Sequence, residues 1–214
     1  MIRGVLFDMD GVLADSEEYI SRAAIRMFRE HGIKAGPEDF IPFVGTGENS
    51  YIGGVAKKYG LTADIEKIKA RTYEIYCEII KGNLRPLPGA VEFVKEVLRR
   101  GLKTAVATSA DAVKMTANLR EIGMPASIFH ATVNGLEVEK RKPSPDIYLK
   151  ACEKTGLKPE ECLVVEDAVS GIRAAKAAGC RCLALETSFH RSLLSEADWI
   201  CKDLSEVPEQ ALKW

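Results

Sequence analysis

Short apolar runs, rich in β-branched residues, recur along the chain and predict the strands of a sheet. The runs are nearly continuous rather than alternating, which is typical of parallel strands that are covered on both faces. The segments expected to form strands are 4–7, 103–108, 162–166, 181–186 and, more weakly, 199–201.

Between the later runs, apolar residues recur at the spacing of helices that bury one face. Such patterns cover 111–123, 144–156 and 168–179, and the last two close with Gly, as helices often do. Strands that alternate with helices of this length predict an α/β fold. We expect a Rossmann-like core of three layers, in which a parallel sheet lies between two layers of helices.

The segment 16–85 breaks this alternation, because it carries helical patterns but no convincing strand. A crossover between two parallel strands takes about 30 residues or a little more, and this segment is more than twice as long. Gly and Pro residues between 82 and 89 mark the return of the chain. We therefore expect a small helical domain at 16–85, inserted into a core domain made of 1–15 and 86–214.

Composition and charge exclude several classes of function. The chain of 214 residues is 46% hydrophobic and 29% charged, as ordinary globular proteins are. Its net charge of −1 leaves no excess of cationic side chains to follow a nucleic-acid backbone. No apolar run is long enough to span a bilayer, and the first run is too short for a signal peptide. We expect a cytoplasmic protein, a monomer by default, with neither nucleic acid nor membrane as partner.

Two aspartates, Asp8 and Asp10, follow the first predicted strand, with Gly11 directly behind them. Ligands of open α/β sheets bind beyond the carboxyl ends of the strands, so Asp8 should face that crevice. Two unpaired carboxylates so close together repel each other there, and a hard divalent cation such as Mg²⁺ removes the repulsion. One carboxylate can attack phosphorus, while the other exchanges protons with the leaving oxygen and with water. The alternative is a helix cap or an Asx turn.

The second strand run ends in Thr108, Ser109 and Ala110, ahead of a predicted helix. A hydroxyl, backbone N–H groups and a helix N-terminus are the groups that hold phosphoryl oxygens. The same residues could equally serve as a helix-capping pair.

A cation and further acids stand at later positions of the same kind. Lys142 precedes a proline and a helix, and Glu166 and Asp167 end the fourth strand run. Lys142 could belong to a solvated charge run, and the acids could start a helix. Because all these groups coincide with strand ends, a phosphate and metal site explains them better together than these alternatives do separately.

The stretches VLFDMDGVLADSE, ATSAD, KPSPDIYLKA and VVEDAVSGIRAAKAAG resemble the haloacid dehalogenase superfamily of aspartyl-phosphate hydrolases. The resemblance is to the branch with β-phosphoglucomutase and phosphoglycolate phosphatase, and it runs nearly end to end. It implies Mg²⁺ as cofactor and a helical cap at 16–85 that closes over the site, with hinges near 14–16 and 85–88.

The resemblance also implies a role for each matching residue. Asp8 is the nucleophile and a Mg²⁺ ligand, and Asp10 is the general acid and base, which binds the metal through its backbone carbonyl. Asp167 binds Mg²⁺, and Glu166 does so directly or through water. Lys142 bridges phosphate and nucleophile, and is preferred over Lys140 because the family's lysine directly precedes proline. The residues expected to contact phosphate or substrate are Gly11, Thr108, Ser109, Ala110, Lys142, Gly45 and Glu48.

Two positions in the expected cap bear on the reaction. Sugar-phosphate mutases of this branch carry a His and an Arg where this chain has Ile20 and Glu48. Without the guanidinium that grips a second phosphate, a Mg²⁺-dependent phosphatase acting on a small phosphorylated metabolite is favoured, such as a sugar phosphate or phosphoglycolate. Glu48 would bind hydroxyls or an amine, or would simply start a helix. A mutase and a phosphate-binding regulatory module of low turnover stay open as alternatives.

Overall fold

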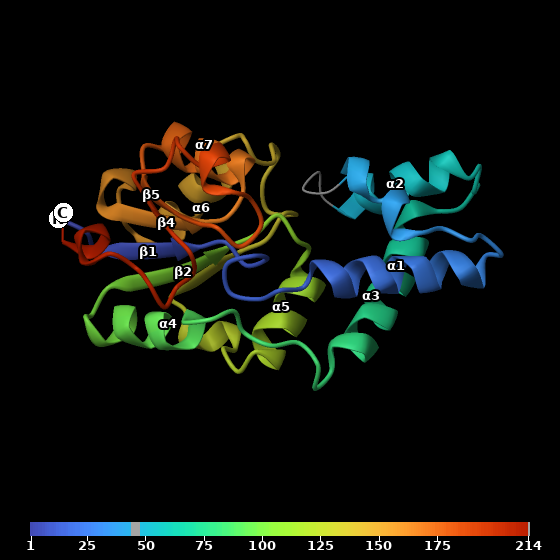
Figure 1. The fold of residues 1–214 in the computed structure, drawn as a ribbon, viewed down its shortest axis with the longest axis horizontal. Coiled ribbons are helices and arrows are strands. Elements are labelled where there is room, and N and C mark those ends of the chain that lie inside the picture. Colours follow the sequence, from blue (N-terminus) through green and yellow to red (C-terminus); the bar gives the residue numbers. More distant parts are fainter. Residues whose placement is uncertain (44–47, 214) are drawn as a thin grey trace.

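The computed structural model describes residues 1–43 and 48–213, with the backbone alone of Glu48. In this part of the chain, six parallel strands form one sheet in the order β3-β2-β1-β4-β5-β6 (Figure 1). The strands are β1 (Gly4–Phe7), β2 (Lys103–Ala107), β3 (Ala131–Val133), β4 (Cys162–Glu166), β5 (Arg181–Leu185) and β6 (Trp199–Cys201). The expected α/β fold with a parallel sheet is confirmed.

Helices cover both faces of this sheet. Helices α4 (Ala90–Arg99) and α5 (Ala112–Glu121) lie on one face, while α6 (Asp146–Thr155) and α7 (Val169–Ala178) lie on the other (Figure 1). Alternate side chains of β1 pack on opposite faces of the sheet. Val5 and Phe7 belong to one buried cluster, and Leu6 belongs to the other. This double burial explains why the strands read as continuous apolar runs.

Strand β3 is the one strand of the sheet that the sequence pattern did not predict. It has three residues, Ala131–Val133, two of which are only half-buried. It pairs with β2 alone and so forms an edge of the sheet. Strand β6 is equally short but was predicted, because it reads WIC, whereas β3 reads ATV and so has a polar residue in place of a continuous apolar run.

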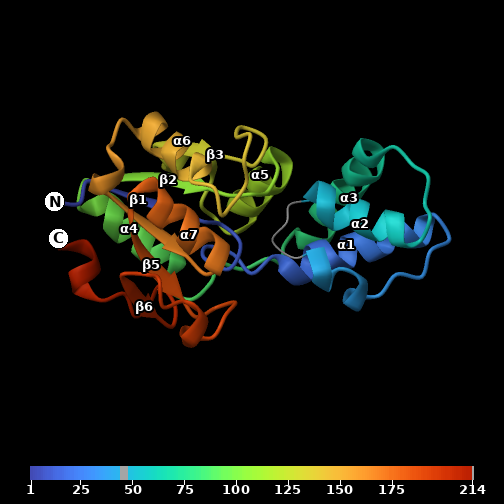
Figure 2. The same cartoon turned by 90° about the horizontal axis from the view of Figure 1, so that it is seen from above.

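The insertion, residues 16–85, holds three α-helices among its described residues, which lie together beyond one end of the sheet (Figure 2). They are α1 (Glu17–Glu30), α2 (Glu48–Lys58) and α3 (Ile65–Ile80), and α1 packs mainly against α3. The sequence pattern did not single out α2, which carries Gly53 and Gly54 in its interior. The glycine at 54 leaves room for Phe43, since a Cβ there would lie 2.3 Å from the ring.

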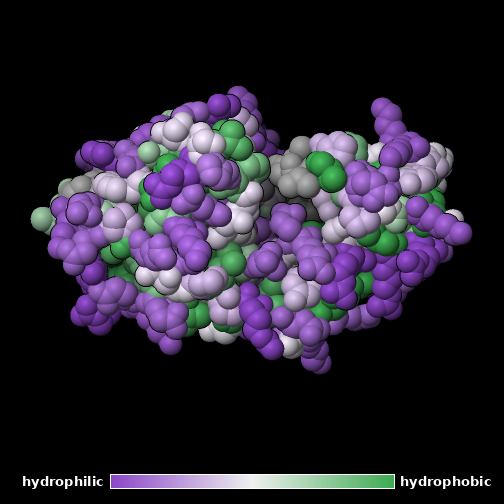
Figure 3. Space-filling model, viewed as in Figure 1, coloured by the Kyte–Doolittle hydropathy of each residue, from purple (hydrophilic) through white to green (hydrophobic). Residues whose placement is uncertain are grey.

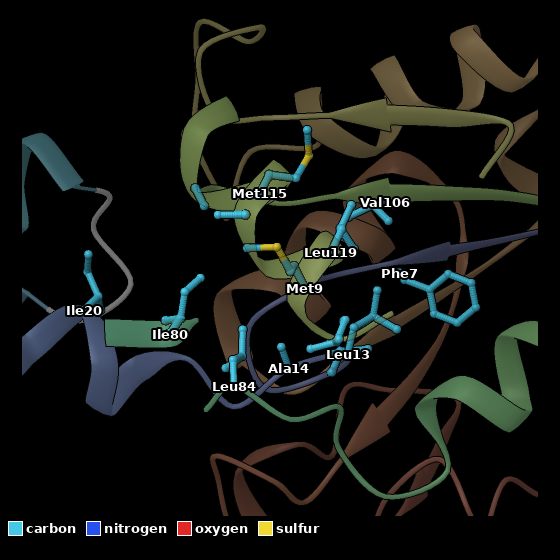
Figure 4. Close-up of a cluster of buried hydrophobic side chains, with 14 of the residues drawn as sticks. Phe7, Met9, Leu13, Ala14, Ile20, Ile80, Leu84, Val106, Met115 and Leu119 are labelled. Atoms are coloured by element: carbon cyan, nitrogen blue, oxygen red, sulfur yellow. The ribbon is translucent and has the colours of Figure 1, made fainter. Parts of the chain in front are cut away.

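The two chain crossings between core and insertion lie side by side. Ala14 pairs with Pro86 in an isolated bridge, and the N–H of Leu87 donates to the carbonyl of Leu13 at 3.0 Å. Around them, one apolar cluster runs from the sheet into the insertion, with Met9 and Leu84 among its members (Figure 4). Hinges were expected near 14–16 and 85–88, where these crossings lie, and the hinge motion itself stays a prediction. None of the helices in the described ranges is long and apolar enough to cross a membrane.

Helix α4 has a glycine near each end, one crowded by neighbouring backbone and one open to solvent, and the two allow the effect of packing to be compared. Gly89 and Gly101 flank it, and both have a left-handed backbone, with φ of +76° and +71°. A Cβ at Gly89 would lie 2.2 Å from the backbone nitrogen of Ser205, whereas a Cβ at Gly101 would meet nothing within 4 Å.

We expect Gly101→Ala to lower the free energy of unfolding by about 1 kcal/mol, through backbone strain alone. Gly89→Ala should lower it by about 3 kcal/mol, because it adds a clash with backbone that cannot move aside cheaply. Urea unfolding followed by circular dichroism measures both values. Equal losses would mean that the contact with the 204–205 segment contributes nothing.

Candidate active site

The predicted site residues meet at one edge of the sheet. Strand β1 lies between β2 and β4, so the residues that follow these strands are neighbours. Asp8 follows β1, Thr108 follows β2, and Glu166 and Asp167 stand at the end of β4. The strand order reverses at β1, and such switch points are where open α/β sheets bind ligands.

A cavity of about 640 Å³ lies over this edge, between the core and the insertion. The molecular surface is hollowed between these two bodies (Figure 3). The core lines the cavity with all the expected acids and with Lys142, and α1 and α2 contribute Ile20 and Tyr51 from the other side. The cavity therefore joins the chemically reactive edge to the segment expected to select the substrate.

Three buried carboxylates form the centre of the site. Oxygen atoms of Asp8, Glu166 and Asp167 all lie within 4.8 Å of one another. The Lys142 ammonium bridges two of them, at 2.5 Å from Asp8 Oδ1 and 2.6 Å from Glu166 Oε1. Tyr148 on α6 donates its hydroxyl to the same Glu166 oxygen at 2.6 Å. Lys142, rather than the exposed Lys140, is thus the lysine of the site.

Burial and mutual repulsion govern the protonation of these groups. Burial raises the pKa of Asp8 to about 7 against the opposing effect of Lys142. Burial, with the charges of Glu166 and Asp8, also raises the pKa of Asp167 well above its usual value. For Glu166, burial is outweighed by Lys142 and by donors including Tyr148, so its pKa is lowered.

This donor set fits a divalent cation. Three carboxylates share one ammonium, which leaves negative charge that a buried site cannot hold cheaply. Carboxylate oxygens are the ligands that Mg²⁺ prefers. The expected metal ligands Asp8, Glu166 and Asp167 are therefore brought together, while metal binding by the Asp10 backbone carbonyl stays a prediction.

Two glycines allow the acids to lie where they do. A Cβ on Gly11 would lie 2.0 Å from Asp167 Oδ2, and a Cβ on Gly171 in α7 would lie 1.7 Å from Glu166 Oε1. Gly11 was expected to contact phosphate, and the structure shows that its lack of a side chain makes room for Asp167.

The expected phosphate-binding residues line the same cavity. Thr108 is almost fully buried, and its hydroxyl oxygen accepts from the N–H of Ala110 at 3.1 Å. Ser109 lies between them and also lines the cavity. Gly45 and the side chain of Glu48 lie outside the described residues, so their predicted contacts with substrate stay predictions.

Asp10 lines the cavity but stands apart from the three-carboxylate cluster. Its carboxylate accepts from the Ser16 hydroxyl, from Lys114 Nζ at 2.9 Å and from Asn118 Nδ2 at 3.3 Å. The sequence interpretation missed these three partners, as it missed Tyr148. A signal existed, because Lys114 and Asn118 are polar residues on the buried face of an amphipathic helix.

The family model for haloacid dehalogenase-like hydrolases matches residues 2–179. The chain belongs to this family. The match spans the acids after β1, the phosphate-binding segment after β2, Lys142 and the acids after β4. The family expected from the sequence motifs is confirmed.

This haloacid dehalogenase-like hydrolase has relatives of several kinds. It is 42% identical to SUPPRESSOR OF QUENCHING 1, a chloroplastic protein of Arabidopsis thaliana, over 92% of this chain but only 19% of that protein. It is 31% identical to hexitol phosphatase A of Escherichia coli, over 96% of this chain and 93% of that one.

Solved structures agree with this assignment. CbbY from Rhodobacter sphaeroides, in complex with phosphate, superposes with a TM-score of 0.88 at 29% identity over the whole of both chains. A CbbY mutant bound to xylulose-1,5-bisphosphate matches with a TM-score of 0.85 at 30% identity, over 96% of each chain.

The raised pKa values of Asp8 and Asp167 predict that Mg²⁺ binding releases protons. An acid with a pKa near 7 is mostly protonated at pH 6 and mostly ionised at pH 8. The apparent affinity for Mg²⁺ should therefore rise about tenfold over this range for Asp8 alone. Calorimetric titration with MgCl₂ in two buffers of different ionisation heat measures the affinity and the protons released. An affinity that is equal at pH 6 and pH 8 would contradict this electrostatic picture.

Proposed function

We propose that this chain is a Mg²⁺-dependent phosphatase, which hydrolyses the phosphate ester of a small metabolite through an aspartyl-phosphate on Asp8. The observation that carries the proposal is the placement of the Asp8 carboxylate. It is buried at the tip of the central strand, in contact with Lys142, and faces a cavity lined by Thr108 and Ser109. These are the nucleophile, the cation and the oxygen-binding groups that phosphoryl transfer needs.

The reaction divides between the two aspartates. A carboxylate oxygen of Asp8 forms a bond to phosphorus, while the bond from phosphorus to the ester oxygen breaks and Asp10 protonates that oxygen. Asp10 then takes a proton from a water molecule, whose oxygen attacks phosphorus and releases inorganic phosphate from Asp8. Lys142 holds the charge of the phosphoryl oxygens beside the nucleophile.

The Mg²⁺ ion would be held by the carboxylates of Asp8, Glu166 and Asp167 and by the backbone carbonyl of Asp10. It would neutralise negative charge on the phosphoryl group during transfer. Residues 1–15 and 86–214 would form the core domain, and the segment 16–85 would act as a cap domain that excludes water from the site. The monomeric state and the cytoplasmic location stay predictions, and the word chloroplastic in one relative's name makes an organelle a second possibility.

A phosphorylated carbohydrate is the substrate class that we favour. The names of hexitol phosphatase A and of the CbbY complex with xylulose-1,5-bisphosphate support this choice. Of the described residues lining the cavity, the two lysines, Lys114 and Lys142, are both paired with carboxylates. Because both lysines are paired, and because Ile20 presents an apolar side chain to the cavity, these residues offer no cation for a second phosphate. We therefore favour a substrate with one phosphate over a bisphosphate.

A phosphate-release screen tests the proposal. Sugar phosphates, hexitol phosphates, phosphoglycolate, nucleotides and p-nitrophenyl phosphate are incubated with the protein, with and without EDTA. We expect metal-dependent release of phosphate from at least one carbohydrate phosphate. Interconversion of glucose phosphates that depends on a bisphosphate would indicate a mutase instead, and no metal-dependent release from any compound would favour a phosphate-binding module.

Asp8→Asn should lower turnover by about a thousandfold or more, because it removes the nucleophile while leaving its size unchanged. Asp64→Asn is the matched control, since Asp64 is an exposed carboxylate outside the cavity and the expected hinges, at a helix N-cap where Asn serves as well as Asp. Steady-state kinetics of both variants, with unfolding curves to show that they are folded, decide the role. Activity of Asp8→Asn within tenfold of the control would refute it.

A further inference from the structure

Helix α5 and its N-cap carry a stripe of polar side chains on their buried face. Asp111, Lys114 and Asn118 follow one another at i, i+3 and i+7, and are 4%, 3% and 0% exposed. Such spacing places side chains on one side of a helix. Buried polar groups cost stability unless they are paired, and apolar residues would pack here more cheaply. The stripe therefore needs an explanation beyond holding α5 against its neighbours.

The stripe contacts helix α3 of the insertion at two points. The Lys69 ammonium lies 3.1 Å from Asp111 Oδ2, and the Tyr76 hydroxyl donates to Asn118 Oδ1 at 2.5 Å. Lys69 and Tyr76 are seven residues apart, as are Asp111 and Asn118, so each helix offers two sites that are two turns apart. Figure 1 shows α5 lying where the core meets the insertion. The two pairs fix the position of α3 along α5 as well as its distance from α5.

The same stripe also contacts Asp10. Lys114 binds one carboxylate oxygen of Asp10, and the amide nitrogen of Asn118 donates to the other oxygen at 3.3 Å. Asn118 thus accepts from Tyr76 with its amide oxygen and donates to Asp10 with its amide nitrogen. The Asp10 carboxylate only accepts and so holds the amide nitrogen toward itself, which leaves the amide oxygen to accept from the Tyr76 hydroxyl. An unbroken chain of hydrogen bonds runs from Tyr76 of α3, through Asn118 of α5, to the partly buried Asp10.

We propose that Tyr76 and Asn118 are positioning residues, which orient the Asp10 carboxylate according to where the insertion lies on the core. This inference rests on the proposed function, in which Asp10 protonates the leaving oxygen. With Tyr76 in place, the Asn118 amide is held and Asp10 keeps a fixed donor. When the hydroxyl is absent, the amide oxygen loses its donor, and the side chain that donates to Asp10 is no longer anchored to α3. Proton transfer depends steeply on such orientation, whereas binding of the phosphoryl group at Asp8 and Lys142 does not.

Tyr76→Phe tests the chain, because it removes a single oxygen atom. Tyr19→Phe is the matched control, since Tyr19 is also a tyrosine of the insertion but donates to the backbone carbonyl of Asn83, on an exposed surface. The substrates are phenyl phosphate and p-nitrophenyl phosphate, which are similar in shape. Only phenyl phosphate has a leaving oxygen that needs a proton, because p-nitrophenolate leaves readily unprotonated. Single-turnover kinetics isolate the step in which Asp8 is phosphorylated.

We expect Tyr76→Phe to slow phosphorylation by phenyl phosphate about tenfold, a fraction of what general acid catalysis contributes. The rate with p-nitrophenyl phosphate and the KM of both substrates should stay within about twofold of the wild type. Tyr19→Phe should change neither rate by more than that. A merely structural role for Tyr76 would slow both substrates alike or raise both KM values, and either result would overturn the proposal.

Two further variants make the test independent of how well Tyr76→Phe folds. Asn118→Leu should show the same selective loss, and the double variant should be no worse than Asn118→Leu, because both residues act through one chain. Additive losses would refute the chain.

Asp10→Ala distinguishes a failure of the proposed function from a failure of this inference. If it slows both substrates alike, the proton-transfer role of Asp10 falls and this inference with it, and if the wild type hydrolyses no compound of the phosphate-release screen, the proposed function falls as well. If Asp10→Ala discriminates and Tyr76→Phe does not, the inference alone is wrong.

Discussion

The contact between the Lys142 ammonium and the carboxylates of Asp8 and Glu166 is the constraint on which the site depends. Three acids are buried together, and one ammonium cannot neutralise them all. Their positions are held from outside by directed donors, such as Tyr148 and the N–H groups of 167 and 168 on Glu166. The result is a site whose electrostatic energy is lowered by a divalent cation, which connects the architecture to metal-dependent chemistry.

The sheet makes this arrangement possible because it brings together residues that are far apart in sequence. Asp8 and Glu166 end adjacent parallel strands, although more than 150 residues separate them. The insertion leaves and rejoins the chain beside the same strand end, where Ala14 pairs with Pro86. A helical domain attached there lies over the reactive edge without disturbing the sheet, and one apolar cluster continues beneath both.

The two aspartates after β1 have different surroundings, which suits the different tasks proposed for them. Asp8 lies among acids and Lys142, whereas Asp10 is held by Ser16 and by Lys114 and Asn118 of α5. Although only Met9 stands between them in sequence, the two carboxylates have different hydrogen-bond partners. Asp10 is linked to the insertion directly by Ser16 and through α5 by Asn118, while Asp8 is not linked to it by any hydrogen bond of the described residues.

The sequence by itself determined the parallel sheet, the inserted helices, the acids at the strand ends and Lys142, because apolar periodicity and position at a strand end are local properties of the chain. It predicted neither β3, whose three residues form no continuous apolar run, nor the partners of Asp10. Polar residues on the buried face of α5 are a signal in the sequence, but which of them meet Asp10 was decided by the tertiary structure. Whether Tyr76, Asn118 and Asp10 meet depends on how α3 packs on α5 and how α5 packs on the sheet, and such distances follow from the packing of whole elements rather than from any local pattern.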